Sequence, residues 1–131
     1  MILGADGVQV GSRFAASLES SSHDNFKHTI VELQEGGTQL TLKELAPVRL
    51  IKNKFYQDVQ QLYEKCPSKE ELVTLLGRAR AKRGMFEGNL EEGELEIGQI
   101  AGLIKDILPA KEIVDTMIAE FEQAKQQGIR F

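Results

Sequence analysis

The chain has 131 residues, of which 41% are hydrophobic and 27% charged, a composition typical of a soluble globular protein rather than a disordered one. Its net charge of -4 argues against non-specific nucleic-acid binding, which needs a clustered positive surface. No apolar run is long enough for a membrane span, and the first residues lack the basic and apolar regions of a signal peptide. The single cysteine, Cys66, cannot form an internal disulfide, which fits a reducing cytoplasm.

The first predicted element is a short strand followed by a glycine turn. Val8 and Val10 alternate with the polar Gln9, which is the pattern of a strand. A strand needs partners for its backbone donors and acceptors. Either this strand pairs with a later one in the chain, or its partners belong upstream of Met1. The pattern is a first indication that the chain is a piece of a larger fold.

A helix is predicted next, with the serines at 20–22 as candidate N-caps and the glycines at 36–37 as its end. Its apolar residues recur at helical spacing: Phe26, Ile30 and Leu33. His23 and His28 lie five residues apart in this helix and therefore point to different faces. We expect both to be solvated surface histidines, and no group of side chains has the spacing of a metal site.

Residues 38–42 and 48–51 predict a small extended pair. In the first segment Leu40 and Leu42 alternate with polar residues, as they would on one face of a strand. Pro47 stands just before the second segment, where its missing N–H does least harm to a strand.

Two helices are predicted in the middle of the chain. The first begins at about Asn53 and has an apolar stripe of Phe55, Val59, Leu62 and Tyr63. The second begins at Ser68, which forms a capping box with Glu71, and ends at about Gly84. Cys66 lies in the turn between them and is interpreted as structural rather than nucleophilic.

A further helix is predicted to begin at about Gly98, and Pro109 opens the last helix from its first turn. The predicted buried face of the last helix consists of Ile113, Val114, Met117 and Phe121. Two charged runs are interpreted as solvated surface. The basic run is Arg78, Arg80, Lys82 and Arg83, and the acidic run is Glu91, Glu92, Glu94 and Glu96.

The most informative segment is residues 4–14, GADGVQVGSRF, which has the pattern of a strand, a glycine turn with a hydroxyl, and the start of a helix. Small residues at the end of a strand let backbone N–H groups approach an anion closely. Gly11 and Ser12 could offer two amides, and the Ser12 hydroxyl a third donor. In a (β/α)8 barrel the loops after the last two strands often form a phosphate site. The alternative is a structural turn with a helix-capping serine, which the pattern alone favours.

Residues 4–14 closely resemble the eighth-strand signature of the nitronate monooxygenase family (formerly 2-nitropropane dioxygenases), which the flavin-dependent enoyl-acyl-carrier-protein reductases share. A second match consists of residues 83–89 (RGMFEGN), Gly93 and residues 98–104 (GQIAGLI). Residues 47–53 (PVRLIKN) are similar to the family's segment beyond the barrel. The three matches keep the family's order and span most of the chain.

The resemblance implies an α/β fold class: the C-terminal fragment of an FMN-binding (β/α)8 TIM barrel, itself mainly helical with one or a few short strands. Residues 1–35 would hold the last barrel strand and the following helix. Residues 36–97 would form a mainly helical extra segment with a short extended pair. Residues 98–131 would be C-terminal helices that return to the barrel.

The resemblance also assigns cofactor-binding residues. The residues that fall where the family holds the FMN phosphate are Gln9, Val10, Gly11 and Ser12. The family commonly has threonine at the position of Ser12, so the hydroxyl is kept. Gln99 lies in a segment that returns toward the flavin in the family. The family's catalytic histidine and its N-terminal flavin-binding strands belong upstream, so no catalytic residue is assigned and the isolated chain is expected to be inactive.

The implied parent protein is a cytoplasmic FMN-dependent oxidoreductase of small molecules. A nitronate monooxygenase would oxidise a nitronate with oxygen, whereas the alternative, an enoyl-acyl-carrier-protein reductase, would pass a hydride to an enoyl thioester. An alternative of another class is a non-catalytic helical interaction module, which copurifying flavin absorbance would exclude. We also expect a homo-oligomer, because uncovered apolar surface and an unpaired strand edge favour association with another copy.

Overall fold

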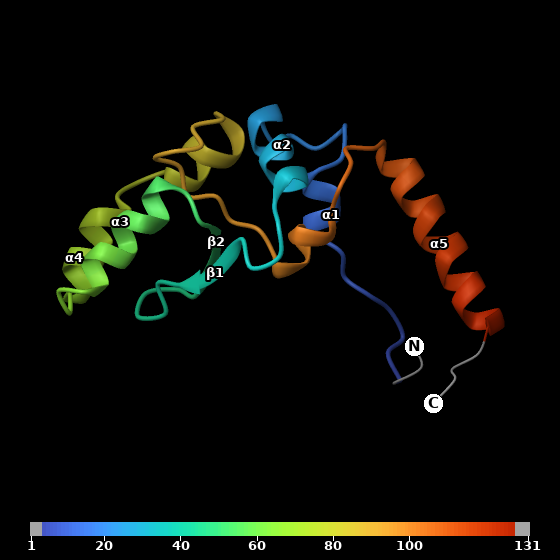
Figure 1. Cartoon of the computed structure of the whole chain (residues 1–131), viewed down its shortest axis with the longest axis horizontal. Coiled ribbons are helices and arrows are strands. Elements are labelled where there is room, and N and C mark those ends of the chain that lie inside the picture. The colour runs from blue at the N-terminus through green and yellow to red at the C-terminus, as the bar shows by residue number, and fades with distance from the viewer. Residues whose placement is uncertain (1–3, 128–131) are drawn as a thin grey trace.

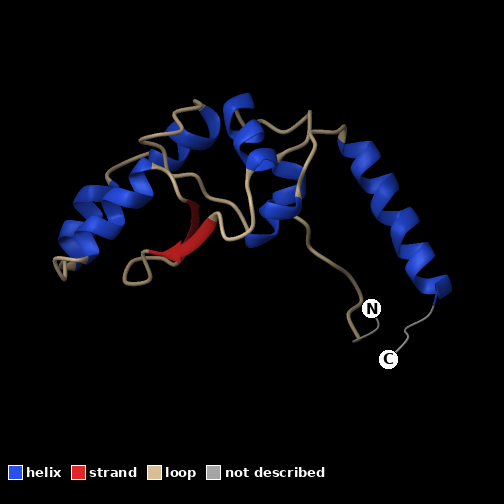
Figure 2. Ribbon diagram, in the orientation of Figure 1, coloured by secondary structure: helices blue, strands red, loops and turns tan. Residues whose placement is uncertain are grey.

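The computed structural model describes residues 4–127 as an open arc (Figure 1). Helices and strands follow in the order α1 (Ser12–Ala15), α2 (Asp24–Glu32), β1 (Thr38–Thr41), β2 (Val48–Ile51), α3 (Lys54–Tyr63), α4 (Lys69–Leu76), η1 (Lys82–Phe86), η2 (Gln99–Leu103) and α5 (Ala110–Gln127). Most of the regular secondary structure in these residues is helical, with one small sheet near the middle of the arc (Figure 2). Among residues 4–127, no helix is both long and apolar enough to cross a membrane.

The predicted extended pair is confirmed as an antiparallel hairpin of β1 and β2. Thr38 lies opposite Ile51, and Thr41 lies opposite Val48. The expected alternation is wrong at the end of β1, because Leu40 is partly exposed while Leu42 is buried. Leu42 stands beyond the strand with a φ of 53°, and this left-handed turn directs its side chain into the core.

The predicted starts of the two middle helices are confirmed, and so is the capping box predicted for the second. The Asn53 side chain accepts a hydrogen bond from the Tyr56 amide at the start of α3, and Ser68 and Glu71 form a complete capping box at the start of α4. The predicted end of α4 is wrong. The helix ends at Gly77, whose φ of 64° suits a glycine, whereas Gly84 is buried in the π-helical turn η1.

Helix α2 begins with a histidine cap rather than one of the serines. His23 Nδ1 accepts a hydrogen bond from the Asn25 amide at 3.1 Å. The ring also packs on the chain at Gly88, where an added Cβ would lie 2.4 Å from Nδ1. The prediction that His23 is a solvated surface residue is therefore wrong, because its ring nitrogen supplies the helix cap, whereas His28 is exposed as expected.

Two hydrophobic cores lie along the arc. The first contains Ala16, Phe26, Ile30, Leu33, Ile51, Leu95, Ile97, Ala101 and Ile104. The second contains Leu42, Leu50, Phe55, Val59 and Leu72. Strand β2 joins them, because its Ile51 belongs to the first core and its Leu50 to the second. The Ile51 amide also donates to the Leu95 carbonyl at 3.0 Å.

The predicted N-terminal strand is not formed. Residues 7–11 have no regular secondary structure, and the Val8 side chain is 81% exposed. The described part of the chain offers this segment no neighbouring strand, and an isolated strand leaves its backbone groups unpaired.

The C-terminal prediction is correct in position but wrong in burial. Helix α5 begins directly after Pro109, yet of its residues Ile113 alone is buried. Val114 and Phe121 are exposed because no other described element covers that side of the helix. The helix predicted to begin at about Gly98 is only the short 3-10 helix η2. Residues 1–3 and 128–131, at the edges of the first and third predicted segments, lie outside the described residues.

Candidate functional site

The site is centred on a contact between two segments that are far apart in the sequence. Ser12 Oγ accepts a hydrogen bond from the Gly98 amide at 3.0 Å across 86 residues. A hydroxyl has one proton to donate as well as lone pairs to accept, so this bond leaves the Ser12 proton available to another group. An added Cβ at Gly98 would lie 2.6 Å from Ser12 Oγ, which explains why a glycine stands there.

The helix-capping interpretation of Ser12 is wrong. The N-cap of α1 is Gly11, whose carbonyl accepts from the Phe14 and Ala15 amides at 3.0 and 3.1 Å. Ser12 is instead the first residue of the helix, and its hydroxyl contacts Gly98 rather than its own helix. Amides at the start of a helix have no partner within it. Within residues 4–127, no group accepts from the Ser12 or Arg13 amide.

Two hollows flank this contact. A groove of about 800 Å³ is lined by four of the predicted residues together with parts of η2 and α5; those four are Gln9, Val10, Gly11 and Ser12. A shallower hollow of about 380 Å³ is lined by Gly11 and Ser12 on one side and by Arg49, Glu96 and Gly98 on the other. Gln99, the fifth predicted residue, is exposed at the start of η2 and lines neither hollow.

Arg13 fixes the wall of the larger groove, a role that the sequence analysis missed. Its guanidinium donates to the Asp106 carbonyl at 3.0 Å and pairs with the Asp106 carboxylate. Nearby, the Leu18 amide donates to the Leu108 carbonyl at 3.0 Å, and Glu19 accepts from the Ala110 amide at 2.8 Å. These contacts attach α5 to the α1 region, and no local sequence signal could have paired residues so far apart.

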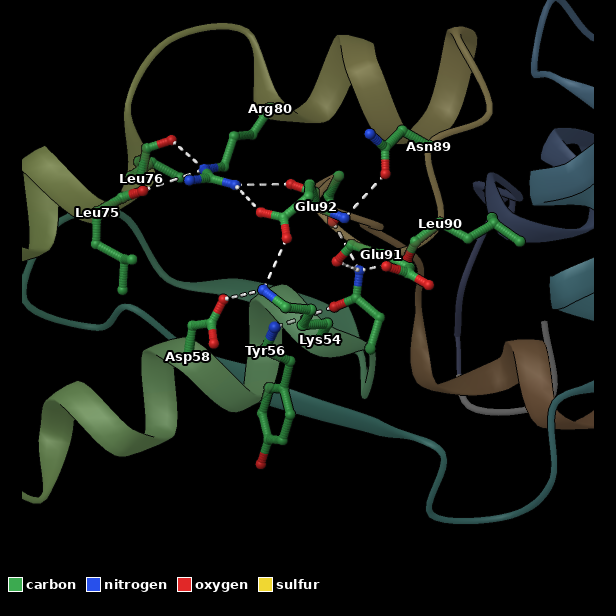
Figure 3. Close-up of polar contacts among 12 residues, drawn as sticks. Lys54, Tyr56, Asp58, Leu75, Leu76, Arg80, Asn89, Leu90, Glu91 and Glu92 are labelled. Carbon is green, nitrogen blue, oxygen red and sulfur yellow. Dashed lines mark hydrogen bonds and ion pairs between the residues drawn. The ribbon is translucent and has the colours of Figure 1, made fainter.

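A polar network holds the loop that leads toward Gly98 (Figure 3). The Asn53 amide group donates to the carbonyls of Leu90 and Gly93, both at 2.8 Å. Its oxygen accepts from the Tyr56 amide at 3.0 Å. One side chain thus caps α3 and fastens the loop to it.

Arg80 is the centre of the same network. It lies 4.6 Å from the centre of the Phe55 ring and donates to the carbonyls of Leu75 and Leu76. It also donates to the Glu92 carbonyl at 2.8 Å. The interpretation of the basic run as wholly solvated is wrong at this residue, because its guanidinium satisfies the carbonyls at the end of α4.

The acidic run is not wholly solvated either. Glu92 accepts from Lys54 at 2.7 Å, and this bond lowers the pKa of Glu92 and raises the pKa of Lys54. Glu94 is only 7% exposed, and burial, helped by the negative charge of Glu96, raises its pKa to about 7. Sequence reasoning missed both because their environment is made by distant residues.

The glycines of the second matched motif have a packing role. An added Cβ at Gly93 would lie 2.2 Å from the Gly84 Cα, so η1 and the loop can touch only through glycine. The loop then continues past the bridge between Leu50 and Glu96 to Gly98. Residues 4–14, 47–53 and 83–104, which carry the resemblance, therefore meet in space around Ser12 and Gly98.

Comparison with known proteins gives the same family from a family model and from two relatives. A family model described as nitronate monooxygenase matches residues 1–120. A probable nitronate monooxygenase of Staphylococcus saprophyticus is 31% identical over 80% of this chain and 30% of its own length. Another, of Bacillus subtilis, is 28% identical over 92% of this chain and 35% of its own length. The chain thus spans about a third of the length of these curated relatives.

Solved structures agree with the sequence relatives. FabK from Thermotoga maritima superposes with a TM-score of 0.84 and 34% identity, over 96% of this chain and 40% of that one. A methionine-to-alanine variant of FabK gives a TM-score of 0.79 and 33% identity, over 96% of this chain and 37% of that one. The predicted fold class, a mainly helical part of a TIM-barrel protein, is confirmed.

Proposed function

The chain belongs to the nitronate monooxygenase family, and from this premise we propose that it is the C-terminal part of an FMN-dependent oxidoreductase. The proposed division is the one predicted from the sequence: residues 1–35 for the last barrel strand and its helix, 36–97 for the extra segment, and 98–131 for the helices that return to the barrel. The observation that carries the proposal is the meeting of the three family segments at the contact between Ser12 and Gly98.

The residues at this contact fit one edge of a phosphate site. The Ser12 hydroxyl keeps a free proton, and the Ser12 and Arg13 amides have no acceptor within residues 4–127. Closely spaced amides and a hydroxyl at a helix start are the donors that bind an oxyanion. We propose that the FMN phosphate lies against Gly11 and Ser12, with Gln9 and Val10 along the groove. Gln99, which lines neither hollow, is kept as a further contact on the resemblance alone. The flavin, when bound, would supply the redox chemistry.

The first proposed activity is oxidation of a nitronate by oxygen, which the names of the curated relatives support. The second is reduction of an enoyl thioester, which the likeness to FabK supports. An assay of the longer protein carrying this segment separates them. Oxygen uptake with a small alkyl nitronate supports the first, whereas oxidation of a reduced nicotinamide with a short enoyl thioester supports the second. A folded, flavin-free protein inactive with both would contradict the proposal.

The isolated chain should neither bind FMN tightly nor turn over a nitronate, because it offers only one edge of the phosphate site. Titration of the purified chain with FMN, followed by flavin fluorescence, measures this. A submicromolar dissociation constant would contradict it. We also propose that the longer protein is a cytoplasmic homo-oligomer; the single free cysteine supports the compartment, and sedimentation equilibrium tests the oligomer.

A further inference from the structure

The smaller hollow beside Ser12 brings two opposite charges together. It lies near the middle of the arc, between α1 and the start of β2 (Figure 1). Its volume is about 380 Å³, and Arg49 and Glu96 are its charged lining residues. The backbone holds these two residues close together, because Ile97, next to Glu96, donates its amide to the Arg49 carbonyl at 3.1 Å. We call this space the charged hollow.

Most of the hydrogen-bonding capacity of Arg49 is unused by the protein. A guanidinium is a planar fork of N–H donors. Within residues 4–127, only Nη1 of Arg49 has acceptors, the carbonyl and the hydroxyl of Thr38 at 3.5 and 3.3 Å, and both bonds are long. Arg13 and Arg80, by contrast, each pair with a carboxylate. Arg49 is half-buried and has no carboxylate partner in the same part of the chain, so its charge is available to a ligand.

Glu96 does not supply the missing partner. It is half-buried in the same hollow, yet among residues 4–127 no ion pair joins it to Arg49 or to another cation. The two charges act on one small volume and together give it no net charge. A dianion such as phosphate is attracted by the guanidinium but repelled by the carboxylate. The pair therefore favours a ligand with a single negative charge, and the FMN phosphate is left to the larger groove.

The remaining walls of the charged hollow suit a short alkyl group. Its apolar lining is supplied by Ala15, Pro47, Val48 and Ile97. Sites for small molecules are mostly apolar, with a few polar groups that fix the orientation of the ligand. The volume of about 380 Å³ is at the lower end of the range for such sites. The hollow therefore suits a short alkyl chain that ends in a singly charged head group.

A short alkyl nitronate meets these requirements. Its single charge is shared by two oxygens in one plane, as in a carboxylate, and a guanidinium fork binds such a pair of oxygens with two parallel hydrogen bonds. We propose that Arg49 and Glu96 determine the charge of the substrate: Arg49 holds the two oxygens of the nitronate, and Glu96 excludes dianions. This proposal rests on the proposed function and narrows it, because an enoyl thioester has no negative charge at its reacting end for Arg49 to bind.

Propionate tests the charged hollow without flavin or turnover, because it is an unreactive carboxylate with the shape of a small nitronate. In the flavin-free longer protein, the NMR signal of the Arg49 Nε–H group should shift as propionate is added. Propionamide, which is neutral, and inorganic phosphate, which is chiefly a dianion above neutral pH, should each bind at least about tenfold more weakly. Equal binding of phosphate and propionate would overturn the proposal, because the hollow would then accept anions of any charge.

Substitutions at the two charges should act in opposite directions. Arg49→Gln removes the fork and should weaken propionate binding by about tenfold or more, and Arg49→Lys, which keeps the charge, should recover part of that loss. Glu96→Gln removes the repelling charge and should strengthen propionate binding by about threefold. Lys52→Gln is the matched control, since Lys52 is exposed and lines neither hollow, and its effect should stay within about twofold. Equal weakening by Arg49→Gln and Glu96→Gln would mean that both residues only shape the hollow, which would overturn the proposal.

Turnover of the flavin-loaded longer protein gives a second readout. Arg49→Gln should raise the KM for a small alkyl nitronate by about tenfold or more and leave kcat and flavin affinity within about threefold, because it removes a substrate contact alone. An unchanged KM in a folded, flavin-loaded variant would overturn the proposal. If the longer protein binds no flavin or oxidises no nitronate, the proposed function fails, and the propionate titrations still decide the role of Arg49.

Discussion

The two ends of the arc differ in how much of their apolar surface they bury. At one end, α3 and α4 close a core around Phe55 and Val59, and the polar network fills its edge with paired groups (Figure 3). At the other end, α5 extends for 18 residues and buries Ile113 alone. The amphipathic character of α5 lies between those of α3 and α4, so amphipathicity alone does not explain the difference. A helix is stabilised mainly by what its apolar face touches, and only one end of this chain provides that contact.

The most direct test of this difference in burial is to truncate one phenylalanine at each end of the arc. Phe55 is fully buried beneath Arg80, so Phe55→Ala should destabilise the chain by about 3–5 kcal/mol. Phe121→Ala on exposed α5 should change the free energy of unfolding by about 0.5 kcal/mol or less. Urea unfolding followed by circular dichroism measures both. Similar losses for the two variants would show that α5 is as well packed as α3.

The polar network gives the next largest effect. Asn53→Ala removes the cap of α3 and leaves the carbonyls of Leu90 and Gly93 without their donor, at a cost of about 2–4 kcal/mol. Asn25→Ala is the control, because Asn25 makes one exposed side-chain hydrogen bond to Gly88 and should cost roughly 1 kcal/mol or less. The denaturant midpoints of the two variants, compared with that of the parent chain at unchanged m-value, give both costs. Equal costs would mean that the loop holds its shape without Asn53.

The buried carboxyl in this network predicts a pH dependence. The pKa of Glu94 is raised from 4.5 to about 7, chiefly by burial, so the folded state binds its proton more tightly than the unfolded state. The contribution to stability is complete below about pH 4.5 and is lost as the pH rises through 7. The loss at pH 8 is on the order of 3 kcal/mol.

Replacement of Glu94 by its neutral amide tests that dependence. Glu94→Gln should match the parent chain at pH 4.5 and be more stable at pH 8, because glutamine cannot acquire the buried charge. Glu96→Gln, at a half-buried neighbour, is the control and should leave most of the pH dependence in place. Thermal melts between pH 4 and 9 provide the measurement. A pH-independent parent chain would show that water reaches the Glu94 carboxylate.

What the sequence could predict depends on the range of the contacts involved. The capping box of Ser68 and Glu71 is made within four residues, so its pattern predicts it directly, and the helix start at Asn53 is equally local. Glu92 and Glu94 were misinterpreted because their partners or covering residues lie elsewhere in the chain. Val8 has the alternation of a strand, but pairing needs neighbours that the described chain lacks.

The candidate site shows the same contrast between local patterns and contacts of distant residues. Resemblance gathered Gln9, Val10, Gly11 and Ser12 into one segment, and the groove does bring them together. From the second motif the resemblance assigns Gln99, whereas the residue that contacts Ser12 is Gly98. A glycine offers no side chain to reason from, and its amide became informative only once the fold placed it beside the hydroxyl.

The smallest expected effect concerns the open end and tests whether Ser12 binds a cofactor or only joins two segments. In the longer protein, Ser12→Ala removes the hydrogen bond proposed to the charged phosphate, worth about 1.5–3 kcal/mol, and should weaken FMN binding by roughly ten- to a hundredfold. Ser12→Thr keeps the hydroxyl and should bind FMN nearly as well as the parent. Gly98→Ala keeps the hydroxyl but displaces it, because the added Cβ would lie 2.6 Å from Oγ, and should weaken binding as Ser12→Ala does. Flavin fluorescence titrations give the affinities, and thermal melts of the flavin-free proteins show whether each variant still folds. If Ser12→Ala lowers the melting temperature but leaves flavin affinity unchanged, the hydroxyl serves only to hold Gly98, and the phosphate must be bound elsewhere.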